Sequence, residues 1–280
     1  MLPNFLIIGT MKGGTTSLYS YLRSHPDVSM STVKELNFFS NDQEWSKGQD
    51  WYSKKFSNES NASAVGEASV NYTKFPYYHS VPERISSLLP EGKFIYMMRS
   101  PIERIYSHYL HNLYADIEPL PLEQAIRQNP LYIQTSQYYS QIEQYLKYFP
   151  KERFLFLFLE KMRESPLETV QQVYSFLGID ANQVPPGLHT RRHQTKDKKG
   201  KDNMLLKGIK KLPFYKALAD SIPDSTKKPL GKIFKTVKVT PPDFFTDEFF
   251  NFILSQLSDD LEKLKSFLGD DLDFWDLQKR

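Results

Sequence analysis

Short apolar runs alternate along this chain with stretches of helical periodicity. The apolar runs cover residues 5–8, 28–30, 93–98 and 154–160. Helical spacing of apolar side chains covers residues 15–22, 81–89, 99–112, 136–148, 165–178 and 246–268. Short runs without polar alternation are typical of parallel strands buried on both faces, and alternation with helices favours βαβ units. The pattern therefore predicts an α/β fold, and we expect 154–160 to be a buried central strand.

One of the predicted helices carries end signals of its own, and another has a long apolar stripe. Ser165 precedes Pro166, Glu168 completes a capping box, and Gly178 stands where the helix should end. The helix over 246–268 has an apolar stripe that would pack on the core. We expect residues 245–280 to form a C-terminal helix of one domain that spans residues 1–280.

The composition limits which classes of protein this chain can belong to. The chain has 280 residues, of which 40% are hydrophobic, so it can bury a large core. It has no cysteine, which excludes disulfides and thiolate metal sites. No run approaches the roughly 18 apolar residues of a membrane span. We therefore expect a cytoplasmic protein. A net charge of +3 is too small to indicate a nucleic-acid-binding polycation, although local basic clusters leave peripheral membrane contact open.

A glycine-bearing loop follows the first apolar run. Residues 9–16 read GTMKGGTT and lead directly into a helical pattern. A strand, a glycine loop and a helix N-terminus together bind phosphate, because backbone N–H groups and the helix dipole favour an anion there. Gly13 and Gly14 allow close approach of the backbone and positive φ angles.

This loop differs from the nucleotide P-loop in the position of its lysine. Gly9, Gly14 and Thr16 fit the spacing G-x-x-x-x-G-K-[ST], but position 15 is threonine and the lysine is Lys12. A true nucleotide-binding loop and a plain turn containing two glycines remain as alternatives.

A second candidate anion site follows the third apolar run. Arg99 comes directly after residues 93–98, where open α/β sheets bind ligands, and Pro101 suits the first turn of the next helix. Ser107 lies two turns further and would face the same crevice. The guanidinium group of Arg99 can bind phosphate oxygens through two hydrogen bonds.

Together these stretches resemble a known family. KGGTTSLYSYL at 12–22 and the pattern Arg-Ser-Pro-x-x-Arg-x-x-Ser-x-Tyr at 99–109 are similar to motifs of the sulfotransferases that use 3′-phosphoadenosine 5′-phosphosulfate (PAPS). The appearance is that of the heparan sulfate N- and 3-O-sulfotransferases and their bacterial counterparts. The resemblance implies a P-loop-like central parallel β-sheet flanked by α-helices. It also implies a 5′-phosphosulfate loop and a 3′-phosphate site, formed respectively by Gly13, Gly14, Thr15, Thr16, Ser17 and by Arg99, Ser107.

The resemblance also implies catalytic residues. The segment KELNFF at 34–39 matches a family motif whose glutamate is the proposed catalytic base, here Glu35, while Lys12 would neutralise charge on the leaving oxygen. The 3-O relatives have histidine where this chain has Asn37, which leaves the acceptor class open. Glu67 matches a family glutamate, but the lysine that follows it is replaced by Ala68.

Weaker matches concern substrate binding and a lid. Tyr138 matches a family tyrosine near the substrate cleft, and Glu67 is an equally weak candidate for substrate contact. Relatives carry Lys-Gly-Arg in a lid over the 3′-phosphate; Lys199, Gly200 and Lys201 match it within the basic run 191–201. The alternative for this run is a solvated, mobile loop.

Three features point elsewhere. Glu160 ends an apolar run and resembles the Mg²⁺-binding acid of a nucleotide kinase, although Arg99 and the displaced Lys12 argue against this. His108 and His111 have metal-ligand spacing without matching carboxylates, and His108 is an alternative base.

The sequence therefore predicts an enzyme that moves a sulfuryl group from PAPS, with 3′-phosphoadenosine 5′-phosphate (PAP) as product. It would need no metal. The acceptor would carry a hydroxyl or an amine, and we expect a carbohydrate. An Mg²⁺-dependent P-loop kinase and a non-catalytic protein that binds anionic polymers are the alternatives.

Overall fold

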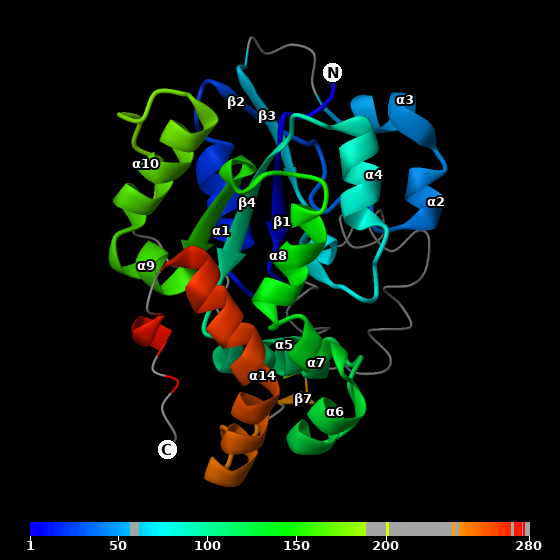
Figure 1. Cartoon of the computed structure of the whole chain (residues 1–280), viewed down its shortest axis with the longest axis vertical. Coiled ribbons are helices and arrows are strands. Elements are labelled where there is room, and N and C mark those ends of the chain that lie inside the picture. Colours follow the sequence, from blue (N-terminus) through cyan, green and yellow to red (C-terminus); the bar gives the residue numbers. More distant parts are fainter. Residues whose placement is uncertain are drawn as a thin grey trace, which may run out of the picture.

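A parallel β-sheet forms the centre of the protein. The computed structural model describes residues 1–56, 62–188, 200–201, 237–238, 241–269, 272–275 and 277. Five parallel strands form a sheet in the order β2-β3-β1-β4-β5 (Figure 1). They are β1 (Phe5–Gly9), β2 (Val28–Met30), β3 (Ala64–Ala68), β4 (Lys93–Met98) and β5 (Phe154–Phe158). The predicted α/β fold is confirmed.

Helices cover both faces of this sheet because its strands are apolar on both sides. Phe5 and Ile7 of β1 belong to one core cluster, whereas Leu6 and Ile8 belong to the other. Side chains alternate along a strand, so neighbouring residues reach opposite faces. The first cluster packs on α1 (Thr15–Leu22), α9 (Leu159–Glu164) and α10 (Pro166–Leu177).

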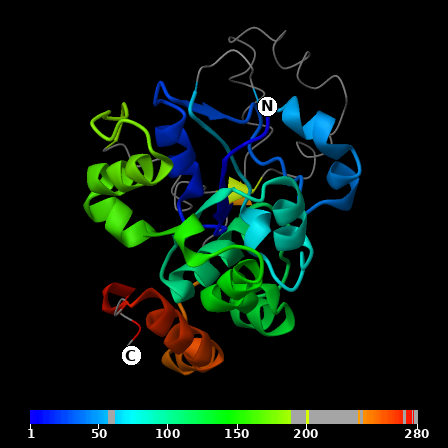
Figure 2. The same ribbon diagram turned by 45° about the horizontal axis from the view of Figure 1, so that its top comes forward.

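The opposite face carries the larger core. Its helices in chain order are α2 (Asp42–Trp45), α3 (Gly48–Ser53), α4 (Val81–Leu88), α5 (Pro101–Tyr114), α6 (Leu122–Gln128), α7 (Leu131–Gln134), α8 (Tyr138–Leu146) and α14 (Asp247–Leu268). Figures 1 and 2 both place α1 and α10 on one side of the strands, and α2, α3 and α4 on the other. Short 3₁₀ turns η1 (Val70–Thr73), η2 (Lys151–Arg153) and η4 (Asp273–Trp275) complete the main elements.

The C-terminal helix is fixed to the core by a buried carboxylate. Thr246 caps α14 by accepting the N–H of Phe249 at 3.2 Å, and Gly269 ends the helix with a positive φ of 68°. Asp260 accepts hydrogen bonds from the backbone of Tyr139 (3.0 Å) and Ser140 (2.8 Å) at the start of α8. The carboxylate thereby satisfies N–H groups that a helix start leaves unpaired. Figure 1 shows α14 across the ends of α5 and α8.

Two local expectations were wrong. The run expected to be a central strand is β5, which lies at the edge of the sheet and pairs with β4. The apolar side chains of β5 are covered by α9, α10 and α14. An edge strand covered by helices has the same apolar sequence as a central strand, so the sequence pattern did not distinguish them. The capping box of α10 does not form either, because the Ser165 side chain makes no capping bond; Thr169 Oγ1 donates to the Ser165 carbonyl at 3.0 Å instead.

A small antiparallel pair lies outside the main sheet. The strands β6 (Gly200–Lys201) and β7 (Val237–Lys238) pair through the register Gly200 with Lys238 and Lys201 with Val237. Within the part of the chain that the structure describes, no helix has the length and apolar character needed to cross a lipid bilayer.

Candidate active site

The two predicted anion sites follow neighbouring strands. Strand β1 pairs with β4 in parallel, with Ile7 opposite Ile95. The Thr10 N–H then donates to the Met97 carbonyl at 2.7 Å, which joins the start of the glycine loop to the end of β4. The loop and Arg99 therefore both lie at the carboxyl ends of their strands, on the side of the sheet where open α/β proteins bind ligands.

The loop backbone needs its glycines. A Cβ atom on Gly13 would lie 2.6 Å from the Met97 carbonyl oxygen, which is closer than any real contact. Gly14 has a φ of 97°, and its Cβ would lie 2.7 Å from Leu159 Cδ1. Lys12 also has a positive φ, 71°. These conformations turn the chain sharply into α1 and leave Gly14, without a side chain, at the helix N-cap.

A buried arginine on α5, Arg104, contacts the backbone of this loop. Arg104 is fully buried and donates to Ser136 Oγ at 2.5 Å, to the Tyr132 carbonyl and, at 3.5 Å, to the Met11 carbonyl in the loop. Burial lowers its pKa to about 10, so the side chain is charged at neutral pH. The sequence motif contained Arg104, but its inward direction is set by how α5 packs.

His108 lies beside this arginine and is not suited to accept a proton. The ring is buried, and Arg104 Nη1 lies 3.4 Å from its Nδ1. Because arginine only donates, that nitrogen is an acceptor and the imidazole is neutral. Burial, followed by the charges of Arg104 and Lys74, lowers the pKa of His108 to about 2. The structure therefore disfavours His108 as the alternative base.

Arg99 is held at the end of β4 by its backbone and its side chain. Tyr138, fully buried, donates its hydroxyl to the Arg99 carbonyl at 2.6 Å. The guanidinium of Arg99 contacts Glu103 Oε2 at 2.6 Å, and its side chain is 16% exposed. Ser107 is buried on the same helix. Tyr138 thus orients Arg99 from behind, and its burial favours positioning over direct contact with a substrate.

Glu35 is held in place through both carboxylate oxygens. Lys34 Nζ lies 2.9 Å from Oε1, and the Val70 N–H donates to Oε2 at 3.1 Å. The Glu35 side chain is 24% exposed, so it remains accessible. A carboxylate has about four lone-pair sites, and these contacts leave capacity for a further donor.

Behind Glu35 lies a second carboxylate, which is sealed from solvent. Glu67 accepts hydrogen bonds from Tyr52 (2.6 Å), Tyr72 (2.7 Å) and Ser69 (2.9 Å). Ser69 Oγ in turn accepts the N–H of Asn37 at 3.0 Å, which links the network to the Glu35 loop. Burial raises the pKa of Glu67 to about 7. This arrangement makes Glu67 a support for the loop and keeps it out of contact with a substrate.

Sequence analysis missed a cation in this region. Lys74 directly follows η1, where Thr73 Oγ1 donates to the Ile8 carbonyl at 3.0 Å beside the start of the glycine loop. Burial and repulsion by Arg104 lower the pKa of Lys74 to about 8, while Glu35 opposes that shift. Lys74 and Lys12 both act electrostatically on His108. Lys74 therefore supplies positive charge near the loop.

Other residues that the sequence singled out either have structural partners or lie outside the described residues. Glu160 accepts the Ser100 N–H at 3.0 Å and Trp275 Nε1 at 3.1 Å, so both its oxygens have structural partners rather than facing a metal. Lys199 lies outside the described residues, and of Gly200 and Lys201 only the backbone in β6 is described. Among the described residues, no group of three or more His, Asp or Glu side chains could hold a metal ion.

Comparison with known proteins identifies the family. A family model described as "Sulfotransferase domain" matches residues 2–211. The chain belongs to the sulfotransferase family. It is 34% identical over 221 residues to human bifunctional heparan sulfate N-deacetylase/N-sulfotransferase 2, covering 71% of this chain and 24% of that protein. It is 33% identical over 193 residues to mouse heparan sulfate glucosamine 3-O-sulfotransferase 5, covering 64% of this chain and 54% of that protein.

A solved structure supports the fold. The crystal structure of a sulfotransferase from Alicyclobacillus acidocaldarius matches with a TM-score of 0.68 and 24% sequence identity, covering 98% of this chain and 99% of that one. The chain spans between about a quarter and about half of the curated sulfotransferases named above. The family and its fold are thus established, and the predicted P-loop-like sheet is confirmed.

Proposed function

We propose that this protein transfers a sulfuryl group from PAPS to a hydroxyl or amine of a carbohydrate. The observation that carries the proposal is that the glycine loop and Arg99 follow the carboxyl ends of two adjacent strands, β1 and β4. An adenosine carrying phosphates at both the 5′ and 3′ positions requires two such anion sites. The family relationship supports PAPS as the donor, because a sulfotransferase needs a sulfuryl donor and this one carries both phosphates.

The loop has the features that a phosphosulfate requires. Gly13 leaves no room for a side chain, so the loop turns tightly against the end of β4 and leads into the N-terminus of α1, where an anion is favoured. Thr10 Oγ1 is buried and has no hydrogen-bond partner among the described residues, which suits a site completed by a ligand. Thr15, Thr16 and Ser17 add hydroxyl groups at the first turn of α1, and Arg99 with Ser107 would bind the 3′-phosphate.

In the proposed reaction the acceptor oxygen or nitrogen attacks sulfur while the bond from sulfur to the 5′-phosphate oxygen breaks. Glu35 takes the acceptor proton, and PAP leaves with the bonding electrons on its phosphate. Lys12 and Lys74 counter the charge that grows on this leaving oxygen. General-base assistance of this kind is typically worth about 10²–10⁴ in rate.

A carbohydrate acceptor is proposed from the relatives. Both curated relatives reported above carry heparan sulfate in their names, one as an N-sulfotransferase and the other as a 3-O-sulfotransferase. The two names cover transfer to nitrogen and to oxygen on a sugar. The proposal therefore takes a sugar hydroxyl or amine as acceptor.

The test compares nucleotides on the full chain. PAP should raise the melting temperature clearly more than ADP or ATP, since Arg99 and Ser107 would have no 3′-phosphate to bind in the latter two. EDTA should leave transfer of radiolabelled sulfate from PAPS unchanged. Lys12→Ala should abolish transfer, whereas Lys54→Ala, at an exposed position after α3, should not. Equal stabilisation by ATP together with activity loss in EDTA would instead support a kinase.

A further inference from the structure

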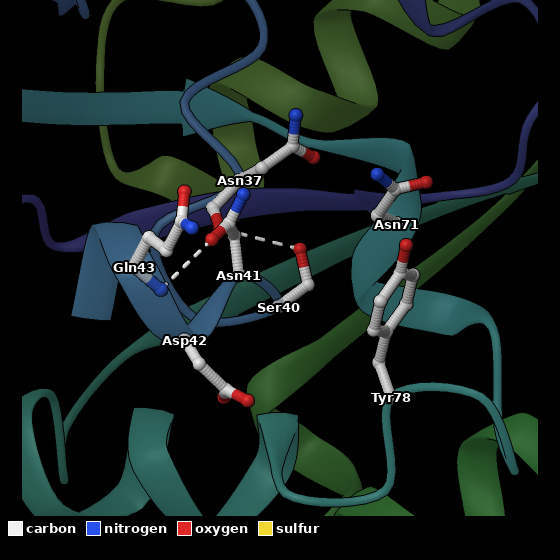
Figure 3. Close-up of a pocket in the computed structure, with 7 residues that line it drawn as sticks. All are labelled: Asn37, Ser40, Asn41, Asp42, Gln43, Asn71 and Tyr78. Carbon is white, nitrogen blue, oxygen red and sulfur yellow. Dashed lines mark hydrogen bonds between the residues drawn. The ribbon is translucent and has the colours of Figure 1, made fainter. Parts of the chain in front are cut away.

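A polar pocket lies beside the Glu35 loop and is not needed for the donor. Its volume is about 580 Å³, within the range of small-molecule sites. One side is formed by residues between Asn37 and Gln43, and the other by Asn71 and Tyr78 (Figure 3). In Figure 3 the side chains of Asn71 and Tyr78 stand on one side of Ser40 and Asn41, with Gln43 on the other.

Both sides of this pocket are connected to the carboxylate of Glu35. Asn37 follows Glu35 by two residues, and its N–H donates to Ser69 Oγ at 3.0 Å. Val70, which donates to Glu35 Oε2 at 3.1 Å, immediately precedes Asn71. The segments that line the pocket are therefore the ones that hold Glu35, the group proposed to take the acceptor proton.

The lining is rich in uncharged donors and acceptors. Asn41 uses its side-chain oxygen to accept the N–H groups of Gln43 (2.9 Å) and Glu44 (3.3 Å), which leaves its NH₂ group as a donor. The Asn71 side chain has no hydrogen bond to any described residue, although all its polar atoms can bond a ligand. Asn37 Oδ1 is buried without a partner in the described part of the chain, so a donor from a ligand would satisfy it.

Charge is nearly absent from the same lining. No lysine, arginine or histidine lines the pocket among the described residues. Its one acid, Asp42, is paired with Arg84 at 2.5 Å and is 88% exposed. An acceptor with carboxylate or sulfate groups would need cations to replace their hydration. A hydroxyl-rich ring needs the mixture of amide and hydroxyl groups that is present.

We propose that this pocket binds the acceptor as a neutral, polyhydroxylated sugar ring and so selects an uncharged saccharide over a uronic-acid polymer. The inference rests on the proposed function and specifies its acceptor. Amide groups suit this role because one amide can donate to one hydroxyl and accept from its neighbour. Asn71 and Tyr78 are the residues to vary, because Asn41 and Ser40 also hold the local backbone.

Binding is tested on the full chain without any nucleotide, by saturation-transfer difference NMR. The probes are cellotetraose, maltotetraose and dodecyl glucoside as neutral ligands, and tetragalacturonate as the anionic one. At least one neutral probe should bind more tightly than tetragalacturonate; dodecyl glucoside alone would indicate a glycolipid headgroup, and a tetrasaccharide a free glycan. Asn71→Ala and Tyr78→Phe should each weaken binding about 2- to 10-fold, the usual range for one lost hydrogen bond. Gln124→Ala, exposed on α6, should bind as the wild type does.

Adding a positive charge to the pocket sharpens the test. Asn71→Lys should improve tetragalacturonate binding while weakening the neutral probes, and PAP should stabilise this variant as it does the wild type. Binding of none of the neutral probes, or a wild-type preference for tetragalacturonate, overturns the pocket assignment. Failure of PAP to stabilise the protein overturns the proposed function separately, because sugar binding is measured without PAP.

Discussion

The backbone N–H of Val70 donates to Oε2 of Glu35 at 3.1 Å, across a sequence separation of 35 residues. This bond fixes the carboxylate against η1, whose last residue, Thr73, contacts the β1 carbonyl that precedes the glycine loop. Glu35 and the loop are therefore positioned by the same short segment. In the proposed reaction this contact would set the geometry of Glu35 relative to the acceptor, on which the efficiency of a general base depends.

Glu35→Gln should lower the rate of sulfate transfer by about 10²–10⁴, the usual worth of a general base. The amide retains an oxygen that can accept the Val70 N–H, so the fold should remain. Single-turnover transfer from labelled PAPS measures the rate, and the PAP-induced rise in melting temperature should be unchanged. Glu83→Gln, exposed on α4, is the matched control. Near-full activity of Glu35→Gln would remove Glu35 from the role of base.

Lys74 should make PAP binding depend on pH above neutrality. Burial and Arg104 lower its pKa to about 8, so the ammonium is charged at pH 7 and loses its proton as the pH rises through 8. PAP affinity, measured by calorimetry from pH 7 to 9.5, should fall over this range. Lys74→Ala should bind PAP about tenfold more weakly at pH 7, in line with one charged hydrogen bond. It should also lose the pH dependence near 8.

Lys74→Arg provides the control for charge. An arginine keeps its charge throughout this range, so PAP affinity should stay level from pH 7 to 9.5. A wild-type profile that is already level would show that Lys74 does not act on the bound nucleotide.

Arg99 should provide discrimination for the 3′-phosphate. Arg99→Ala should weaken PAP binding by about 10- to 100-fold, since hydrogen bonds to charged groups are worth about 1.5–3 kcal/mol. ADP, without that phosphate, should bind the variant and the wild type about equally. Titration calorimetry with both nucleotides measures the difference. A parallel loss for ADP would place Arg99 at another part of the nucleotide.

Gly13→Ala should damage the loop through sterics alone. The added Cβ would lie 2.6 Å from the Met97 carbonyl oxygen, which is backbone and cannot rotate away. Overpacking of this kind typically costs about 1–3 kcal/mol. Urea unfolding should show that loss, and PAP stabilisation should disappear with it. Gly48→Ala is a useful comparison, because its Cβ would meet no atom within 4 Å, although its φ of 77° also favours glycine.

Glu67 should make stability depend on pH. Its pKa in the folded protein is raised from 4.5 to about 7, so the folded state retains a proton that the unfolded chain releases between these values. Folding stability therefore falls as the pH rises through that window. Glu67→Gln lacks this effect, and its free energy of unfolding relative to the wild type should increase by up to about 3 kcal/mol from pH 5 to pH 8. A constant difference between the two proteins would contradict the raised pKa.

The sequence was sufficient for much of the framework. The runs at 5–8 and 93–98 became β1 and β4, because apolar runs of this length bury both faces in a parallel sheet. The end signal at Gly178 also matched a real helix end, since capping depends on residues close in sequence. The edge position of β5 was missed because strand order depends on partners that a local pattern does not name.

Some features of the candidate site follow from short sequence motifs, whereas others follow only from the tertiary structure. The sequence by itself placed the glycine loop and Arg99 after apolar runs that became β1 and β4, and it offered Glu35 as the candidate base through a motif resemblance. Only the tertiary structure decided that Glu67 is sealed behind Glu35, that Arg104 supports the loop, and that Lys74 adds charge beside it. Burial and charge coupling arise from groups brought together across the fold, so their effects on pKa and accessibility follow from packing in three dimensions.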